Sequence, residues 1–221
     1  MKFDSYGKNW DPAEHYKDVQ IARKYDQERF TSLGGRLFNT LERRLIRHAF
    51  ADMGRESVIV DIPCGTGRLA EELVQNGHHV VGIDIAPAML EVATSKMTRH
   101  SGRFETVIHD ARQLQHLGRT FDAALCARVL MHLPLEEQIV FLRGIASICR
   151  GRIVFTQGID TEYQRLRRKL KAALGHQAPA VYPLTETMIG QLLDGVGLRE
   201  VRRDYVFPGV SESFVLVAEK R

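Results

Sequence analysis

The sequence predicts an α/β protein with a mostly parallel sheet of seven strands, helices ahead of the sheet, and an antiparallel pair of strands at the carboxyl end. After Gly54, short runs rich in β-branched residues alternate with helical periodicity, a pattern typical of parallel βαβ units. The last two strand-like runs are instead joined through Pro208-Gly209, which is a turn signal. A chain of 221 residues is long enough for one such domain with a buried core.

The parallel strands are expected at residues 57–62, 79–85, 103–109, 121–127 and 151–156. The helices between them are expected at residues 68–76, 88–99, 112–117 and 135–148. Right-handed crossover connections place the carboxyl ends of these strands at one edge of the sheet, where open α/β folds bind ligands. We therefore expect the functional site at this edge.

Helical periodicity also occurs at both ends of the chain. Two helices are expected ahead of the sheet at residues 12–30 and 36–53, separated by Gly34-Gly35. The carboxyl end is expected to form a helix at residues 185–196 and strands at residues 198–207 and 213–219. This organisation predicts an N-terminal helical segment at residues 1–54 and a main domain at residues 55–221, with a helical insertion near residues 159–184.

The composition excludes several classes of protein. No apolar stretch approaches the roughly 20 residues of a membrane-spanning helix, and the amino terminus lacks the apolar core of a secretory signal, so we expect a cytoplasmic protein. Cys64, Cys126 and Cys149 have no paired spacing, which favours buried thiols over a metal site. The net charge of +4 is too small for a nucleic-acid-coating surface.

The clearest motif is the strand and turn at residues 58–69, which contains Gly65 and Gly67. Glycines let the backbone approach a ligand closely, and the helix that follows offers free N–H donors. Any βα turn also favours small residues, so the glycines alone leave a purely structural interpretation open.

Acidic residues at three strand ends favour the ligand-binding interpretation. Asp61 ends the first strand, Asp84 ends the second at a position suited to ribose hydroxyls, and Asp110 follows the third, where it can accept from an adenine amino group. Asp122, at the start of the fourth strand, is interpreted as structural. Together with the turn, these residues predict a site for a nucleoside-containing cofactor.

These motifs resemble, in order and spacing, the class I (Rossmann-like) S-adenosylmethionine-dependent methyltransferases. The matching segments are Asp61-x-Pro-x-Gly-x-Gly67, Gly82-x-Asp84, Met89-Leu90, Asp110-Ala111, Phe121-Asp122 and Val129-Leu130-x-His132-Leu133. The resemblance begins near Ser57 and continues to the carboxyl terminus. Pro63 stands where the family has the first glycine of the turn, so one N–H donor is missing there.

The resemblance implies S-adenosyl-L-methionine as the cofactor and a role for each matching position. The turn would lie beside the methionine part, Asp84 would hold the ribose and Asp110 the adenine, and Asp61 and the backbone near Cys126 would face the ammonium. Arg68 would either attract the cofactor carboxylate or be a solvated arginine. The residues expected to bind the cofactor are Asp61, Pro63, Cys64, Gly65, Gly67, Arg68, Asp84, Ile85, Met89, Asp110, Ala111, Cys126 and Ala127.

Two other functions remain open at this point. A nicotinamide-dependent oxidoreductase would prefer G-x-G-x-x-G at the turn, and this chain has Arg68 and Ala70 where further small residues are expected. A sensor or partner subunit would bind S-adenosylmethionine without transferring its methyl group. The absence of a decisive acceptor-side residue fits that alternative, but it equally fits in-line methyl transfer, in which positioning supplies much of the catalysis.

No catalytic residue can be assigned from the sequence, and three candidates are named. His132 lies just past the fourth strand, where it would be structural or a general base. Arg128 would contact an anionic acceptor or be a capping charge. Tyr25-Asp26 resembles a pair found in small-molecule and quinone methyltransferases, where this segment folds over the cofactor as a lid; an ordinary amphipathic helix is the other interpretation.

The segment at residues 160–175 is a basic amphipathic helix in the sequence pattern. One face carries Tyr163, Leu166, Leu170 and Leu174, and the basic residues Arg165, Arg167, Arg168, Lys169 and Lys171 lie elsewhere. Such a helix is solvated, faces an anionic substrate or lies on a membrane surface. We expect a small-molecule or lipid-like acceptor, with peripheral membrane contact as a hypothesis and no nucleic-acid partner.

Overall fold

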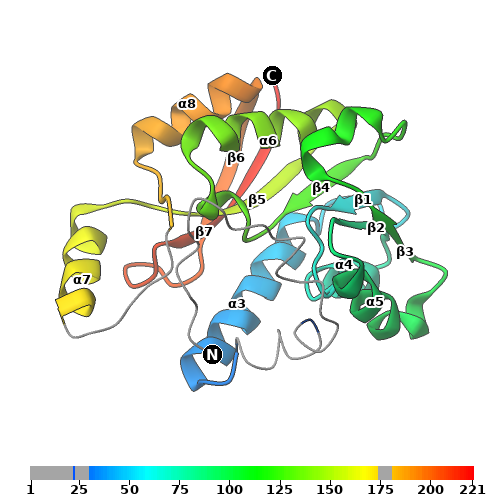
Figure 1. The fold of residues 1–221 in the computed structure, drawn as a ribbon, viewed down its shortest axis with the longest axis horizontal. Coiled ribbons are helices and arrows are strands. Elements are labelled where there is room, and N and C mark those ends of the chain that lie inside the picture. The colour runs from blue at the N-terminus through cyan, green and yellow to red at the C-terminus, as the bar shows by residue number, and fades with distance from the viewer. Residues whose placement is uncertain (1–21, 23–29, 174–180) are drawn as a thin grey trace.

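The computed structural model describes residue 22 and residues 30–173 and 181–221, and in these residues the chain forms three layers (Figure 1). Seven strands make one sheet in the order β3-β2-β1-β4-β5-β7-β6. The strands are β1 (Val58–Asp61), β2 (His79–Asp84), β3 (Phe104–Ile108), β4 (Ala123–Cys126), β5 (Ile153–Gly158), β6 (Leu198–Tyr205) and β7 (Ser213–Lys220). Strands β1 to β5 run parallel, β7 is antiparallel to β5, and β6 is antiparallel to β7. The predicted sheet is therefore confirmed, including its antiparallel end.

Helices cover both faces of this sheet. In Figure 1, α6 and α8 lie above the sheet, and α3, α4 and α5 lie below it. The α-helices are α3 (Leu33–Ala49), α4 (Ala70–Gln75), α5 (Pro87–Lys96), α6 (Leu135–Ile148), α7 (Glu162–Ala173) and α8 (Glu186–Val196). Short 3₁₀ helices are η1 (Thr98–His100), η2 (Ala111–His116) and η3 (Leu130–His132).

Alternating strand residues build a separate core on each face. On β5, Ile153 and Phe155 join the core shared with α6 and α8, whereas Val154 joins the core shared with α3 and α4. This alternation follows from the two-residue period of a strand, and strands buried on both faces are rich in aliphatic residues for the same reason. Asp122 accepts the N–H of Val58 at 2.8 Å and so fastens β4 to the start of β1, which confirms its structural interpretation.

The helix ends carry the expected capping chemistry. Ser32 accepts from Gly35 N–H at the start of α3, and Thr185 accepts from Met188 N–H at the start of α8. Gly197 ends α8 with a φ of 78°, a left-handed conformation that favours glycine.

Four predicted helices differ from the observed ones. The helix predicted at residues 36–53 is α3, Leu33–Ala49, so Gly34-Gly35 lie inside this helix and do not separate it from the preceding segment. The helix predicted at residues 68–76 begins only at Ala70, because the turn occupies two more residues. The helix predicted at residues 88–99 ends at Lys96 and continues as η1, and the one predicted at residues 112–117 is the 3₁₀ helix η2 with a non-helical Gln113. The helix predicted at residues 12–30 and its lid role lie outside the described residues, apart from Ala22 and Phe30.

All three cysteines are free and buried, as predicted. None of the helices in the described part of the chain is long and apolar enough to cross a membrane.

Candidate functional site

The turn between β1 and α4 is tied to the end of β2 by its own backbone. Cys64 N–H donates to the carbonyl oxygen of Ile83 at 2.9 Å, and Gly65 N–H donates to Oδ2 of Asp84 at 2.9 Å. The Ile62–Pro63 peptide bond is cis. The sequence thus brings the glycine turn and the acidic end of β2 together at the carboxyl edge of the sheet, where both were predicted.

The glycines in this region serve different purposes. Gly65 has a φ of 52°, and a Cβ built on it would meet no atom within 4 Å. Gly67 has a φ of 71°, but its Cβ would lie 3.2 Å from the Cβ of Ala93 on α5, so this residue also permits close helix packing. A Cβ on Gly82 would lie 2.8 Å from Sγ of Cys64, so only glycine lets the turn lie against β2. Gly65 alone borders open space, as expected of a position beside a ligand.

Asp84 is held by two backbone donors. Its Oδ2 accepts from Gly65 and its Oδ1 accepts from Ala86 N–H at 2.9 Å, while the residue is only 8% exposed. Burial raises the pKa of this carboxyl above its ordinary value, against the opposing effect of these hydrogen bonds. The carboxylate is therefore fixed in position before any ligand binds.

Asp61 is the second buried carboxyl, and it is 2% exposed. Burial is the main cause that raises its pKa to about 8, Arg68 opposes the rise, and the neighbouring charge of Asp84 adds to it. A cationic ligand beside this group would favour its ionised form. The site thus holds a carboxyl that is largely protonated at neutral pH until a cation arrives.

An acidic residue that the sequence analysis did not single out connects α3 to this edge. Glu42 is 1% exposed, and its two oxygens accept from Arg68 at 2.6 Å and from Arg128 at 3.2 Å. Despite the opposing effect of burial, the two guanidinium groups lower the pKa of Glu42. Arg68 also donates to Oδ1 of Asn39 at 2.6 Å, so it is a half-buried, paired side chain and not the solvated arginine considered from the sequence.

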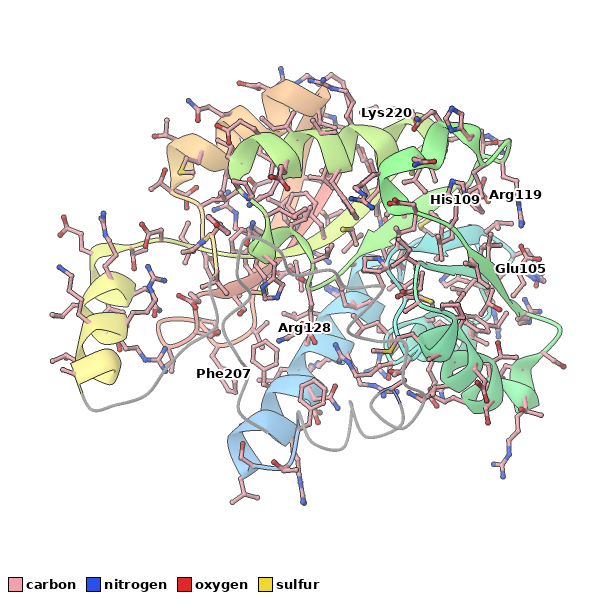
Figure 2. All side chains as sticks on the ribbon, viewed as in Figure 1. Glu105, His109, Arg119, Arg128, Phe207 and Lys220 are labelled. Atoms are coloured by element: carbon pink, nitrogen blue, oxygen red, sulfur yellow. The ribbon has the colours of Figure 1, made fainter. Side chains whose placement is uncertain are left out.

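Arg128 follows β4 with an unusual backbone conformation. Its φ is 63°, in the left-handed region that residues with a side chain rarely adopt, and its N–H donates to Oγ1 of Thr156 at 2.7 Å. The guanidinium lies 5.3 Å from the ring centre of Phe38 on α3. Figure 2 shows Arg128 between α3 and the sheet. Non-glycine residues held in this way cluster at functional sites, and Arg128 is one of the candidates named from the sequence.

The third acidic strand end is also in place. Asp110 follows β3 and caps η2 by accepting from Arg112 N–H at 2.9 Å, and it forms an ion pair with the Arg112 side chain at 2.7 Å. This arginine lowers the pKa of Asp110. Nε2 of the neighbouring His109 lies 2.9 Å from the carbonyl oxygen of Gln113.

The remaining candidates have these positions. Cys126 is fully buried at the end of β4, Ala127 and Ile85 are half-buried, and Met89 is buried in a small cluster with Ala22 and Ala88. Ala111 begins η2, and His132 ends η3, half-buried. Tyr25 lies outside the described residues. No group of histidine, cysteine or acidic side chains suited to a metal ion occurs in the part of the chain that the structure describes.

The chain has a Rossmann-like methyltransferase fold. This follows from the order of the strands, the placement of the helices and the contact between the turn and Asp84 at the edge of the sheet. Residues 59–151 match the family model described as "Methyltransferase domain". The matched residues thus form a class I S-adenosylmethionine-dependent methyltransferase domain, and the cofactor of that class is S-adenosylmethionine.

The names of the sequence relatives indicate different acceptors. The chain is 29% identical over 99 residues to a magnesium-protoporphyrin O-methyltransferase of Synechocystis sp., covering 45% of this chain and 43% of that protein. It is 34% identical over 111 residues to the mitochondrial ubiquinone biosynthesis O-methyltransferase of Schizosaccharomyces pombe, covering 49% of this chain and 40% of that protein. The chain thus matches less than half the length of these relatives.

Solved structures confirm the fold over a longer stretch. Magnesium protoporphyrin IX methyltransferase from Synechocystis, with bound S-adenosylhomocysteine, superposes with a TM-score of 0.76 at 20% identity, covering 95% of this chain and 98% of that chain. A mitomycin 7-O-methyltransferase superposes with a TM-score of 0.66 at 20% identity, covering 91% and 60%. At this identity the likeness concerns the fold.

Proposed function

We propose that this protein transfers the methyl group of S-adenosylmethionine directly and in line to a small-molecule acceptor of lipid- or quinone-like character. One observation carries the proposal. The open Gly65 turn is hydrogen-bonded to the buried Asp84 carboxylate and lies beside a second buried carboxyl, Asp61. This arrangement offers donors and acceptors of the kinds that an amino acid joined to a nucleoside requires.

The residues present fit the cofactor. Backbone N–H groups, among them those of Gly65 and Ala86, orient the two oxygens of Asp84, and a carboxylate can accept further hydrogen bonds, so it is suited to a ribose diol. Asp61 is suited to the cofactor's ammonium, since a cation favours its ionised form. We assign Asp110 to the adenine, and the backbone near Cys126 and Ala127 to the ammonium side of the pocket. Pro63, Cys64, Gly65 and Gly67 form the turn, and Ile85, Met89 and Ala111 complete the set proposed to bind the cofactor.

Arg68 has a supporting role in this proposal. Its guanidinium is engaged by Glu42 and Asn39, so contact with the cofactor carboxylate would have to coexist with these bonds. The pair Arg68–Glu42 instead fastens α3 against the turn. We therefore propose Arg68 chiefly as a positioning residue.

When bound, S-adenosylmethionine supplies a methyl group on a positively charged sulfur, which is an activated leaving group. The protein's contribution is to hold the acceptor in line and to exclude water at the strand edge. An acidic acceptor group, such as a phenol, also needs a base. His132 is the candidate for that role, because an imidazole can act as a general base and a guanidinium has no acceptor atom. We propose that Arg128 faces the acceptor.

Two relatives support a small-molecule acceptor, because one is named for magnesium-protoporphyrin and the other for ubiquinone biosynthesis. An acceptor with an extended apolar part also suits the exposed apolar residues near the edge of the fold. Among them are Tyr182 at 46% and Val210 at 55% exposure.

The test is transfer of a labelled methyl group from S-adenosylmethionine into cell extracts. We expect label to enter an organic-phase product with the wild-type protein, and Asp84→Ala to reduce both product and cofactor affinity. The loss in binding should be about 1–3 kcal/mol, the scale for removing a hydrogen-bonded charged partner. Incorporation only into aqueous products would contradict the lipid- or quinone-like acceptor. Cofactor binding without incorporation into any extract would support the sensor alternative.

A further inference from the structure

Helix α7 contacts the rest of the protein through its polar side. Gln164 is 4% exposed and donates to the carbonyl oxygen of Val210 at 3.3 Å. Arg167 donates to the same oxygen at 2.8 Å, and Arg168 forms ion pairs with Asp160 and Glu212. Residues 164 and 168 are one helical turn apart, so they lie on one face. That face is directed toward the β6–β7 loop.

The apolar side of the same helix is directed outward. Tyr163, Leu166 and Leu170 are 57%, 58% and 58% exposed, and their spacing of three and four residues forms one stripe. A solvated surface helix has the opposite arrangement, with its apolar stripe against the core. Figure 1 shows α7 at the side of the molecule, away from the sheet. The solvated interpretation considered from the sequence does not account for this orientation.

Positive charge flanks the apolar stripe. The helix contains five basic residues and one acidic residue. Arg165 and Lys169 are exposed. Nε of Arg165 lies 3.9 Å from Oδ2 of Asp160, but this carboxylate already pairs with Arg168. The charge on this side is therefore directed outward together with the stripe.

We propose that the stripe formed by Tyr163, Leu166 and Leu170 docks on an anionic lipid membrane. Leucines enter the boundary between headgroups and acyl chains, the tyrosine stays at headgroup level, and the flanking basic side chains contact lipid phosphates. Val210, 55% exposed and bonded through its carbonyl to α7, widens the apolar surface. A second copy of the chain fits less well, because pairing two such faces would oppose their basic flanks. This inference does not depend on the proposed reaction.

Vesicle sedimentation tests the proposal with the whole protein. We expect binding to phosphatidylcholine vesicles that contain phosphatidylglycerol, and little binding to phosphatidylcholine alone. Binding should fall as salt is raised, because the screening length shrinks from about 10 Å at 0.1 M to about 3 Å at 1 M. The variant Leu166→Gln/Leu170→Gln should lose roughly tenfold or more of its vesicle affinity. Lys169→Glu should lose at least about fivefold.

Matched control variants separate docking from general effects. Val140→Gln removes an apolar side chain that is 62% exposed on α6, and Arg99→Glu makes the same charge change as Lys169→Glu in η1, after α5. Both controls should bind vesicles like the wild type. All variants should keep the cofactor affinity of the wild type, because they leave the turn and strand ends unaltered.

Three results would overturn the proposal. They are failure of the wild-type protein to bind anionic vesicles, undiminished binding by the leucine double variant, and equal losses in the controls. Sedimentation equilibrium adds an independent readout: a dimer that dissociates in the leucine double variant would instead assign the stripe to a second copy of the chain.

Discussion

Two buried carboxyl groups, at the ends of adjacent strands, dominate the chemistry of the site at the scale of single residues. An ionised carboxylate is costly to bury without a partner. Burial raises the pKa of both groups. Backbone donors oppose the rise at Asp84, whereas at Asp61 the pKa reaches about 8. The difference suits Asp84 to neutral hydroxyls and Asp61 to a cation.

Cofactor binding should therefore release a proton from Asp61. Near pH 7, below its raised pKa of about 8, this carboxyl is mostly protonated in the free protein. A bound ammonium favours the carboxylate, so affinity should rise as the pH increases from about 6 to about 8. Calorimetry in buffers of different ionisation enthalpy should detect this proton, up to about one per cofactor. The same release from Asp61→Asn would show that another group titrates.

Glu42 should make a large, pH-dependent contribution to stability. Its pKa is lowered in the folded protein, so the contribution is present above the ordinary value of 4.5 and is lost as the pH falls below it. Glu42→Gln leaves Arg68 and Arg128 without their charged partner. It should lower the free energy of unfolding at pH 7 by about 3 kcal/mol, measured by urea denaturation.

An exposed ion pair provides the control for Glu42. The side chain of Glu56 is 71% exposed and pairs with Arg103 at 3.0 Å, so Glu56→Gln should change stability far less than Glu42→Gln. Equal effects of the two substitutions would contradict the importance of burial at Glu42.

Sequence reasoning found Asp61 and Asp84 but not Glu42. The two aspartates each end a strand, so their place at the sheet edge follows from local pattern and parallel topology. Glu42 lies in a helix with ordinary amphipathic spacing, and its partners are 26 and 86 residues away along the chain. Only the packing of α3 against the strand edge brings these three residues together.

At the scale of elements, the turn between β1 and α4 has two requirements: residues that tolerate positive φ angles, and open space for a ligand. Gly65 and Gly197 both have positive φ and open space at the Cβ position. Gly65→Ala and Gly197→Ala should therefore lose similar stability, about 1–2 kcal/mol each. Gly65→Ala alone should weaken cofactor binding, because its added Cβ projects into the space proposed for the ligand.

Thermal unfolding together with calorimetry checks this pair of variants. If Gly65→Ala binds the cofactor with unchanged affinity, Gly65 does not lie beside the bound cofactor. Gly67→Ala extends the comparison, since its Cβ would press on Ala93 at 3.2 Å. This variant should lose more stability than either of the other two.

The elements were predicted best where the pattern is long and regular. The five parallel strands and α6 follow from β-branched runs and helical periodicity, and α6 has the predicted bounds, Leu135–Ile148. The segment at η2 is too short for periodicity to separate an α-helix from a 3₁₀ helix. The sequence also predicts the apolar stripe of α7, but not its outward direction, because the contacts of Gln164 and Arg168 depend on the distant β6–β7 loop.

At the scale of the whole molecule, two cores enclose one sheet, and the site lies where the strand ends meet both. The turn follows β1, which lies between β2 and β4 in the sheet, and Glu42 reaches it from the layer below. A ligand that binds this edge contacts groups fixed by several layers. Binding should therefore stabilise the entire fold and not a single loop.

A thermal shift measures this coupling and also separates the methyltransferase from the oxidoreductase. At about 100 times its dissociation constant, a ligand specific to the folded state adds about 2.7 kcal/mol. For a chain of 221 residues, this should raise the Tm by roughly 5–10 °C. S-adenosylmethionine should produce the shift in the wild-type protein and a smaller one, at the same concentration, in Asp84→Ala. NADH should produce none, because the turn lacks the further small residues that favour a pyrophosphate; a larger shift with NADH would reverse the assignment.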